Sequence, residues 1–211
     1  MIRQPAVAGS FYPADPASLT RDLDRMLQTD IVPQQAKAII VPHAGYVYSG
    51  AVAGELIAGT EIPPKVVLFG PNHHGVGQDI DVTGADSWNT PLGEVPVAVA
   101  LRDQLCEEIS GLMVDDRAHA AEHSLEVMLP FLLKRQPDLQ IVPISLRYLD
   151  YQGAANLGRS IAAVLRQQQE EVLLLASSDM NHFLDAETTE RLDFMAISAM
   201  TNFDPDALYR T

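Results

Sequence analysis

Apolar residues along the chain alternate between short continuous runs and longer segments with helical spacing. The continuous runs are bounded by proline, glycine or polar residues, as expected for strands buried on both faces of a sheet; they are 38–41, 66–69, 141–146 and 172–176. Apolar residues at helical spacing, or runs of small residues, predict helices over 15–28, 49–57, 98–109, 122–134 and 151–168. The alternation predicts an α/β fold in which helices flank a central sheet.

Two further segments and one proline refine this picture. Residues 79–84 predict a short strand, whereas 87–93 is bracketed by proline and glycine and is expected to be a turn-rich connection. Pro130 should kink or break the helix 122–134, because proline lacks a backbone donor and clashes with the preceding turn. No internal repeat, low-complexity tract or linker interrupts the chain, so we expect residues 1–211 to form a single domain.

Polar motifs follow three of the predicted strands directly. They read Pro42-His43-Ala44-Gly45-Tyr46, Gly70-Pro71-Asn72-His73-His74 and Ser177-Ser178-Asp179-Met180-Asn181-His182. Ligands of open α/β sheets bind beyond the carboxyl ends of the strands, where side chains from several strands converge. We therefore expect these motifs to contribute to one site.

Each histidine taken alone is better explained as a solvated surface or capping residue. Their concentration at strand ends favours metal binding, proton transfer or both, because histidine is the commonest metal ligand and titrates near neutral pH. His119 and His123 stand four residues apart, a spacing that allows two ligands on one helical face. The same stretch is equally consistent with a helix start, where Glu122 and Glu126 would lie near the positive end of the helix dipole.

Composition excludes several classes of function. The net charge is −14 with only 14 Lys and Arg residues, which argues against a nucleic-acid partner. Cys106 is the single cysteine, so an internal disulfide or a thiolate metal cluster is excluded. No glycine-rich phosphate loop predicts a nucleotide cofactor, and no apolar segment approaches the roughly 20 residues of a membrane span. We expect a cytoplasmic protein without a membrane partner.

The motifs together resemble those of the Memo family, in the family's order and over nearly the whole chain. The matching stretches are Gly9-Ser10-Phe11-Tyr12, Pro42 to Gly50, Gly70 to His74, Glu122 to Glu126 with Leu129-Pro130-Phe131, and Ser177 to His182. Bacterial and archaeal Memo proteins are the B component of the AmmeMemoRadiSam system. The family is similar to the class III extradiol dioxygenases of the LigB type, which implies an α/β fold with a metal site at the strand ends.

The resemblance also implies roles for individual residues. His43 and His74 are the implied ligands of a divalent metal ion (Fe, Cu or Zn), and His123 is the implied acid–base histidine. Asn181 stands at the third ligand position, where animal relatives carry cysteine and the dioxygenases glutamate. Asp179, His123 or solvent are the alternatives there, and Asp179 is also a candidate catalytic group. The residues expected to line the pocket are Tyr12, Tyr46, Asn72, His73 and His182. His73 would orient His74 or bind substrate, or face solvent.

Two functions remain open on these grounds. One is a metal-dependent oxidoreductase related to the dioxygenases; the other is a non-catalytic binding or adaptor module that holds a peptide or small anion in the same pocket. A hydrolase, or a partner of the radical-enzyme and companion components of the same system, is a third alternative. Family members generally continue for several more elements, so the chain is expected to be shortened at its C-terminus.

We expect no extradiol ring cleavage of catechols. That reaction uses an iron ion held by two histidines and a carboxylate, and Asn181 supplies an uncharged amide at the matching position. Oxygen uptake by iron-loaded protein with a panel of catechols should stay at the level of iron in buffer. Ring-opened product that disappears in His123→Ala would contradict this expectation.

Overall fold

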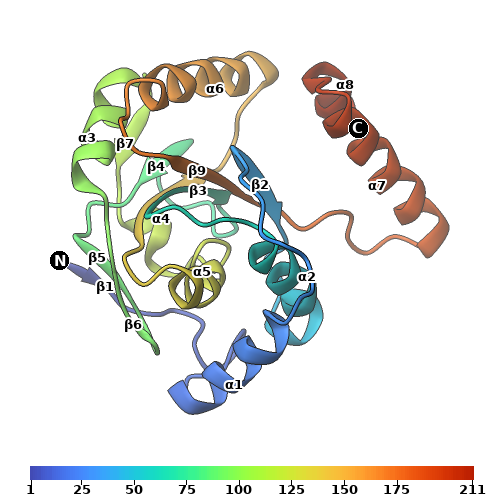
Figure 1. Cartoon of the computed structure of the whole chain (residues 1–211). Coiled ribbons are helices and arrows are strands. Elements are labelled where there is room, and N and C mark those ends of the chain that lie inside the picture. Colours follow the sequence, from blue (N-terminus) through green and yellow to red (C-terminus); the bar gives the residue numbers. More distant parts are fainter.

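A six-stranded mixed sheet forms the centre of the computed structural model, which describes residues 1–211 (Figure 1). Its strands, in spatial order, are β2 (Ala38–Val41), β9 (Val172–Ser177), β3 (Lys65–Pro71), β8 (Gln140–Leu146), β4 (Ile80–Val82) and β7 (Leu112–Val114). All neighbouring strands are parallel except β8 and β4. A second, three-stranded sheet comprises β1 (Ile2–Arg3), β5 (Ser87–Thr90) and β6 (Gly93–Pro96).

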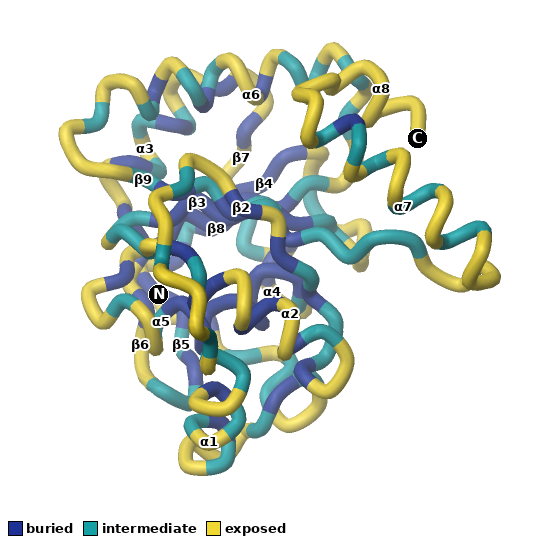
Figure 2. Tube along the Cα trace, turned by 45° about the vertical axis from the view of Figure 1, so that its right-hand side comes forward, coloured by how far each residue is buried: buried dark blue, intermediate teal, exposed yellow.

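Helices cover both faces of the central sheet. Successive residues of β3 alternate between two hydrophobic clusters: Val66 and Leu68 belong to one cluster, and Val67 belongs to the other. The first cluster includes residues of α1 (Pro16–Met26), α2 (Tyr46–Ala58) and α5 (Leu129–Arg135). The second includes residues of α3 (Val99–Glu108) and α6 (Tyr151–Leu165). Burial on both faces explains why the strands read as continuous apolar runs, and Figure 2 shows them in the buried interior.

The predicted single-domain α/β fold is confirmed, with corrections at two segments. Residues 87–93 are not a turn-rich connection: β5 and β6 pair as an antiparallel hairpin, which buries Trp88. The helix expected over 122–134 is confined to a 3₁₀ turn, η1 (Glu126–Met128), followed by α5. Pro130 lies in the first turn of α5, where a missing backbone donor costs nothing.

The last two helices, α7 (Ala186–Thr201) and α8 (Pro205–Arg210), lie at one side of this body and contact each other. The ring of Tyr209 in α8 is 5.5 Å from that of Tyr151 in α6, and Ala199 is the only buried residue of the last two helices. Figure 1 shows them to one side of the sheet, next to β2 and α6. The hydrophobic pattern predicted neither helix.

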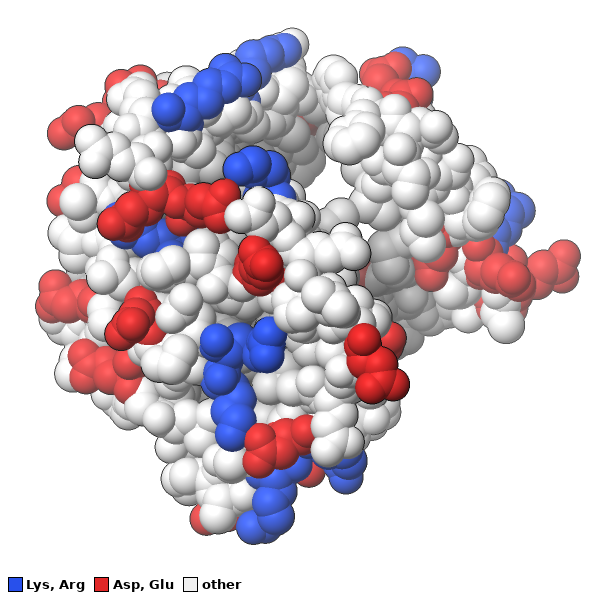
Figure 3. All heavy atoms as spheres, in the orientation of Figure 1, with Lys and Arg blue, Asp and Glu red and all other residues white.

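The surface carries charges of both signs. On the face drawn in Figure 3, basic and acidic side chains form small groups between uncharged areas, and at several places groups of opposite sign touch. No helix in the chain combines the length and apolarity that crossing a membrane requires.

A buried ion pair anchors the N-terminal segment to the body. Arg3 donates to Glu126 (2.6 Å) and to the backbone carbonyls of His119 and Glu122 (2.8 Å each). Glu126 also accepts from the amides of Ala6 and Val7 and from the Tyr12 hydroxyl. Every oxygen of this carboxylate is thus bonded, which is the condition for burying an ion pair without a large penalty. The α4 helix (Arg117–Ala120) and the segment that follows it are fixed by these bonds.

Glu126→Gln should therefore destabilise the protein by about 3–5 kcal/mol, since it leaves the Arg3 guanidinium buried without its counter-charge. Glu170→Gln breaks the exposed Lys65–Glu170 pair (2.8 Å) and should cost no more than about 1 kcal/mol. Urea unfolding of the two variants measures both effects. A loss below about 1 kcal/mol in Glu126→Gln would contradict the role of the buried pair.

Candidate metal centre

Three adjacent parallel strands end beneath the site. β9 lies between β2 and β3, and Val41 of β2 is in register with Ser177 at the end of β9. His43 follows β2 and His73 follows β3, so the sheet brings the two side chains to its carboxyl edge. The third histidine, His123, comes from the irregular segment between α4 and η1.

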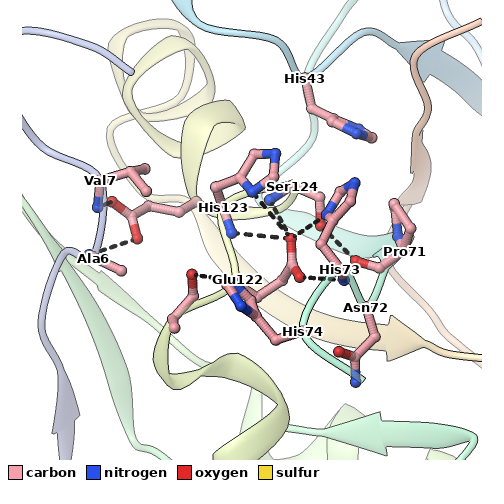
Figure 4. Close-up of polar contacts among 12 residues, drawn as sticks. Ala6, Val7, His43, Pro71, Asn72, His73, His74, Glu122, His123 and Ser124 are labelled. Atoms are coloured by element: carbon pink, nitrogen blue, oxygen red, sulfur yellow. Dashed lines mark hydrogen bonds and ion pairs between the residues drawn. The ribbon is translucent and has the colours of Figure 1, made fainter. Parts of the chain in front are cut away.

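The rings of His43, His73 and His123 form one cluster, shown in Figure 4. The ring centroids are 5.3 Å apart for His43 and His73, 5.6 Å for His43 and His123, and 4.5 Å for His73 and His123. One nitrogen from each ring lies within 4.8 Å of the others, close enough for the three to share an ion. His43 is buried, His123 is partly buried and His73 is exposed to solvent.

A glycine allows the His123 segment to reach the sheet. A Cβ on Gly70 would lie 2.7 Å from both Ser124 Oγ and Leu125 Cδ2, so a side chain at this position would push the segment away from β3. The Ser124 hydroxyl also donates to the carbonyl of Pro71 (3.0 Å). The strand end and the His123 segment are therefore held in direct contact.

The buried carboxylate of Glu122 joins two of the histidines. It accepts the backbone amide of His73 (2.7 Å) and the Nδ1–H of the His73 ring (2.8 Å), and also the amides of His123 and Ser124 (Figure 4). Burial opposes ionisation of Glu122, but these hydrogen bonds outweigh it and lower its pKa to about 2. Because the ionised carboxylate can only accept, His73 carries its proton on Nδ1 and presents the Nε2 lone pair.

His43 is held by the end of β9. Its ring Nδ1 lies 2.8 Å from Ser177 Oγ, and its backbone amide donates to Asp179 Oδ1 (2.6 Å). Asp179 Oδ2 lies 3.9 Å from His43 Nε2 and 3.5 Å from His182 Nε2. Burial lowers the pKa of His43 and of His123, against the opposing effects of Asp179 and Glu122 respectively. Both rings are therefore neutral near pH 7, as metal ligation requires.

The structure corrects the expected pairing of His43 with His74. His74 is exposed, and its Nε2 donates to the carbonyl of Ala121 (3.0 Å), away from the cluster. Its neighbour His73 occupies the position instead. The Asn72 side chain explains the orientation: it accepts the Gly75 amide and donates to the Val76 carbonyl, which closes a tight loop just beyond the strand.

Of the other expected site residues, some lie next to the histidine cluster and others make contacts elsewhere. Asp179 lies beside His43, and His182 lies beside Asp179. Asn181 lines a hollow of about 410 Å³ between the end of β9 and α7, and its backbone N–H donates to Asp193 Oδ1. The role of its side chain as a third ligand stays a prediction. Tyr12 and Tyr46 are buried and donate to Glu126 and to the Val127 carbonyl.

His119 does not join the cluster. It is buried in α4 with its ring 5.5 Å from Trp88, and burial together with the nearby Arg3 lowers its pKa to about 4. The helical face that His119 and His123 could have shared does not form, because α4 ends at Ala120.

Sequence reasoning missed Glu122 and Ser177 as parts of the site. The sequence places Glu122 near a possible helix start and Ser177 in a polar motif, and both lie in stretches that match the Memo family, but it assigns neither residue a role in the site. Their positions in the sequence could have indicated a role, because Glu122 immediately precedes His123 and Ser177 immediately follows the apolar run 172–176.

The pKa of Glu122 predicts a pH dependence of stability. Its ionised form is stabilised in the folded protein, so this contribution is fully present above about pH 4.5 and is lost as the pH falls toward about 2. Over this window, wild type should lose up to about 3 kcal/mol more stability than Glu122→Gln, as measured by urea unfolding at each pH. The exposed Glu94→Gln should keep the wild-type dependence. Equal pH dependence in wild type and Glu122→Gln would refute the assignment.

Comparison with known proteins places the chain in a family. The family model described as "Memo-like protein" matches residues 3–211. A MEMO1 family protein of Aquifex aeolicus is 42% identical over 99% of this chain and 78% of its own length. Similar proteins of Archaeoglobus fulgidus (40% identical, 100% of this chain, 79% of the relative) and Methanothermobacter thermautotrophicus (34%, 99% and 80%) carry the same description. The chain belongs to the Memo family.

Proposed function

We propose that the chain is a metal-dependent oxidoreductase whose divalent ion is held at the histidine cluster. The observation that carries the proposal is the convergence of three imidazole nitrogens, from His43, His73 and His123, within 4.8 Å of one another. The similarity of the Memo family to the class III dioxygenases supports redox chemistry at this place in the fold.

The donor set fits a transition metal. Neutral imidazole suits iron, copper and zinc, whereas magnesium and calcium prefer oxygen ligands. Glu122 holds the His73 ring in the tautomer that presents Nε2, a carboxylate–histidine arrangement that is common behind metal ligands. Bound there, iron or copper would supply a Lewis acid and a one-electron redox centre.

The hydrogen bonds suggest different roles for the three histidines. His43 and His73 each have Nδ1 within hydrogen-bonding distance of a fixed partner, which suits permanent ligands. No hydrogen bond holds either ring nitrogen of His123, and its Nδ1 lies 3.5 Å from Glu122. A neutral and unrestrained imidazole can accept a proton from a substrate bound beside the ion. We assign His123 this acid–base role, with Asp179 as the neighbouring carboxylate. His43 and His73 would then be the protein ligands of the ion, and His123 would lie beside it.

A cavity lined in part by Phe11 supports the second candidate function, a non-catalytic binding module. It measures about 780 Å³ and lies between the Gly9–Pro13 loop, α1 and α2, with Phe11, Tyr12 and Arg25 in its wall. The Phe11 ring packs against His123 at 4.5 Å, so one residue of the cavity wall contacts the histidine cluster. A small molecule or peptide held there would bind equally well to metal-depleted protein, whereas the first proposal requires the ion.

Metal binding tests the proposal directly. His43→Ala and His73→Ala should each weaken binding of Zn²⁺ or anaerobic Fe²⁺ by at least about 100-fold, more than the usual loss for an outer-shell partner. His74→Ala is the matched control, because its ring points to Ala121, and it should bind like wild type. Isothermal titration and elemental analysis of anaerobically purified protein provide the measurements. Equal loss in the His73 and His74 variants, or no binding by wild type, would overturn the proposal.

A further inference from the structure

Ser177 occupies a buried position between two elements of the site. Its Oγ lies 2.8 Å from His43 Nδ1 and 2.6 Å from the backbone carbonyl of Ser124. The residue is 4% exposed and ends β9, the strand between β2 and β3. Its hydroxyl thus links the segment after β2 to the segment that carries His123.

The Ser177 hydroxyl, the Ser124 carbonyl and the His43 ring together determine which atom donates in each of the two hydrogen bonds of Ser177. A carbonyl oxygen can only accept, so the single hydroxyl proton of Ser177 points to Ser124. The oxygen of Ser177 then has only lone pairs to offer His43. A hydrogen bond between them requires the proton on Nδ1 of His43, which leaves the Nε2 lone pair facing the cluster.

Asp179 favours the opposite arrangement. Its Oδ2 lies 3.9 Å from His43 Nε2, and Oδ1 already accepts the amides of His43 and Ala44. A proton on Nε2 would be attracted to this carboxylate. It would also block the nitrogen that a metal ion needs. The tautomer of His43 therefore depends on which interaction is stronger, that of Nδ1–H with Ser177 or that of Nε2–H with Asp179.

We infer that Ser177 is a positioning residue that fixes His43 in the Nδ1–H tautomer and so keeps its Nε2 available to a ligand of the histidine cluster. The metal-affinity consequence rests on the proposed function, whereas the tautomer itself does not.

The tautomer can be measured on metal-free protein. Long-range ¹H–¹⁵N correlation spectra of ¹⁵N-histidine-labelled protein, at a pH where the imidazoles are neutral, report which ring nitrogen carries the proton; His43→Ala assigns the signal. Wild type should show Nδ1–H, and Ser177→Ala should shift His43 toward Nε2–H. A wild-type His43 protonated on Nε2 would overturn the inference, whatever the variants do and whether or not the protein binds metal.

Metal affinity provides the second readout. Ser177→Ala should weaken Zn²⁺ binding by about 10- to 100-fold, the usual cost of losing an outer-shell partner. Ser177→Thr retains a hydroxyl and should restore most of the affinity and the Nδ1–H signal. Ser178→Ala is the matched control, because the Ser178 hydroxyl contacts the Asp179 carbonyl and not His43, and it should behave like wild type. Unchanged tautomer and affinity in a folded Ser177→Ala would refute the inference.

Discussion

The buried pair of Arg3 and Glu126 is the interaction on which the rest of the site depends. Removing two charges from water is costly, and the cost is offset only when the remaining donors and acceptors are satisfied. Here the spare guanidinium donors bind the carbonyls of His119 and Glu122, and the carboxylate accepts from the N-terminal segment. The hydrogen bonds that offset the cost of burying Arg3 and Glu126 also fix the segment that carries His123.

Glu122 lies closer to the histidine cluster and is also held by several hydrogen bonds. Its carbonyl is held by Arg3, while its carboxylate binds three amides and the His73 ring. Hydrogen bonds thus hold both the backbone carbonyl and the carboxylate of Glu122, which fixes the orientation of its side chain. The cluster is therefore organised by the protein itself, as expected of sites whose ligands are oriented by surrounding hydrogen bonds.

The parts of the structure that follow from local pattern were predictable. Continuous apolar runs identified the long parallel strands, and histidines directly after two of them located the site. The choice between His73 and His74 was not predictable, because adjacent residues after a strand point in different directions and the loop geometry comes from Asn72 and distant Glu122. The β5–β6 hairpin was missed since Pro91 and Gly93, which form its turn region, dominate the local pattern. α7 has only one buried residue and so lacks a clear apolar face.

The strand order has a consequence for how the protein acquires its site. The hydrogen bonds from His43 to Ser177 and Asp179 join residues 134 and 136 positions apart, and both lie across a parallel strand pair. Contacts this distant in sequence form late and slowly, because a long loop must close before they contribute. In the unfolded chain, His43, His73 and His123 are far apart in sequence and are not held together. An ion that is held at the cluster of these rings would therefore bind only after the sheet has assembled.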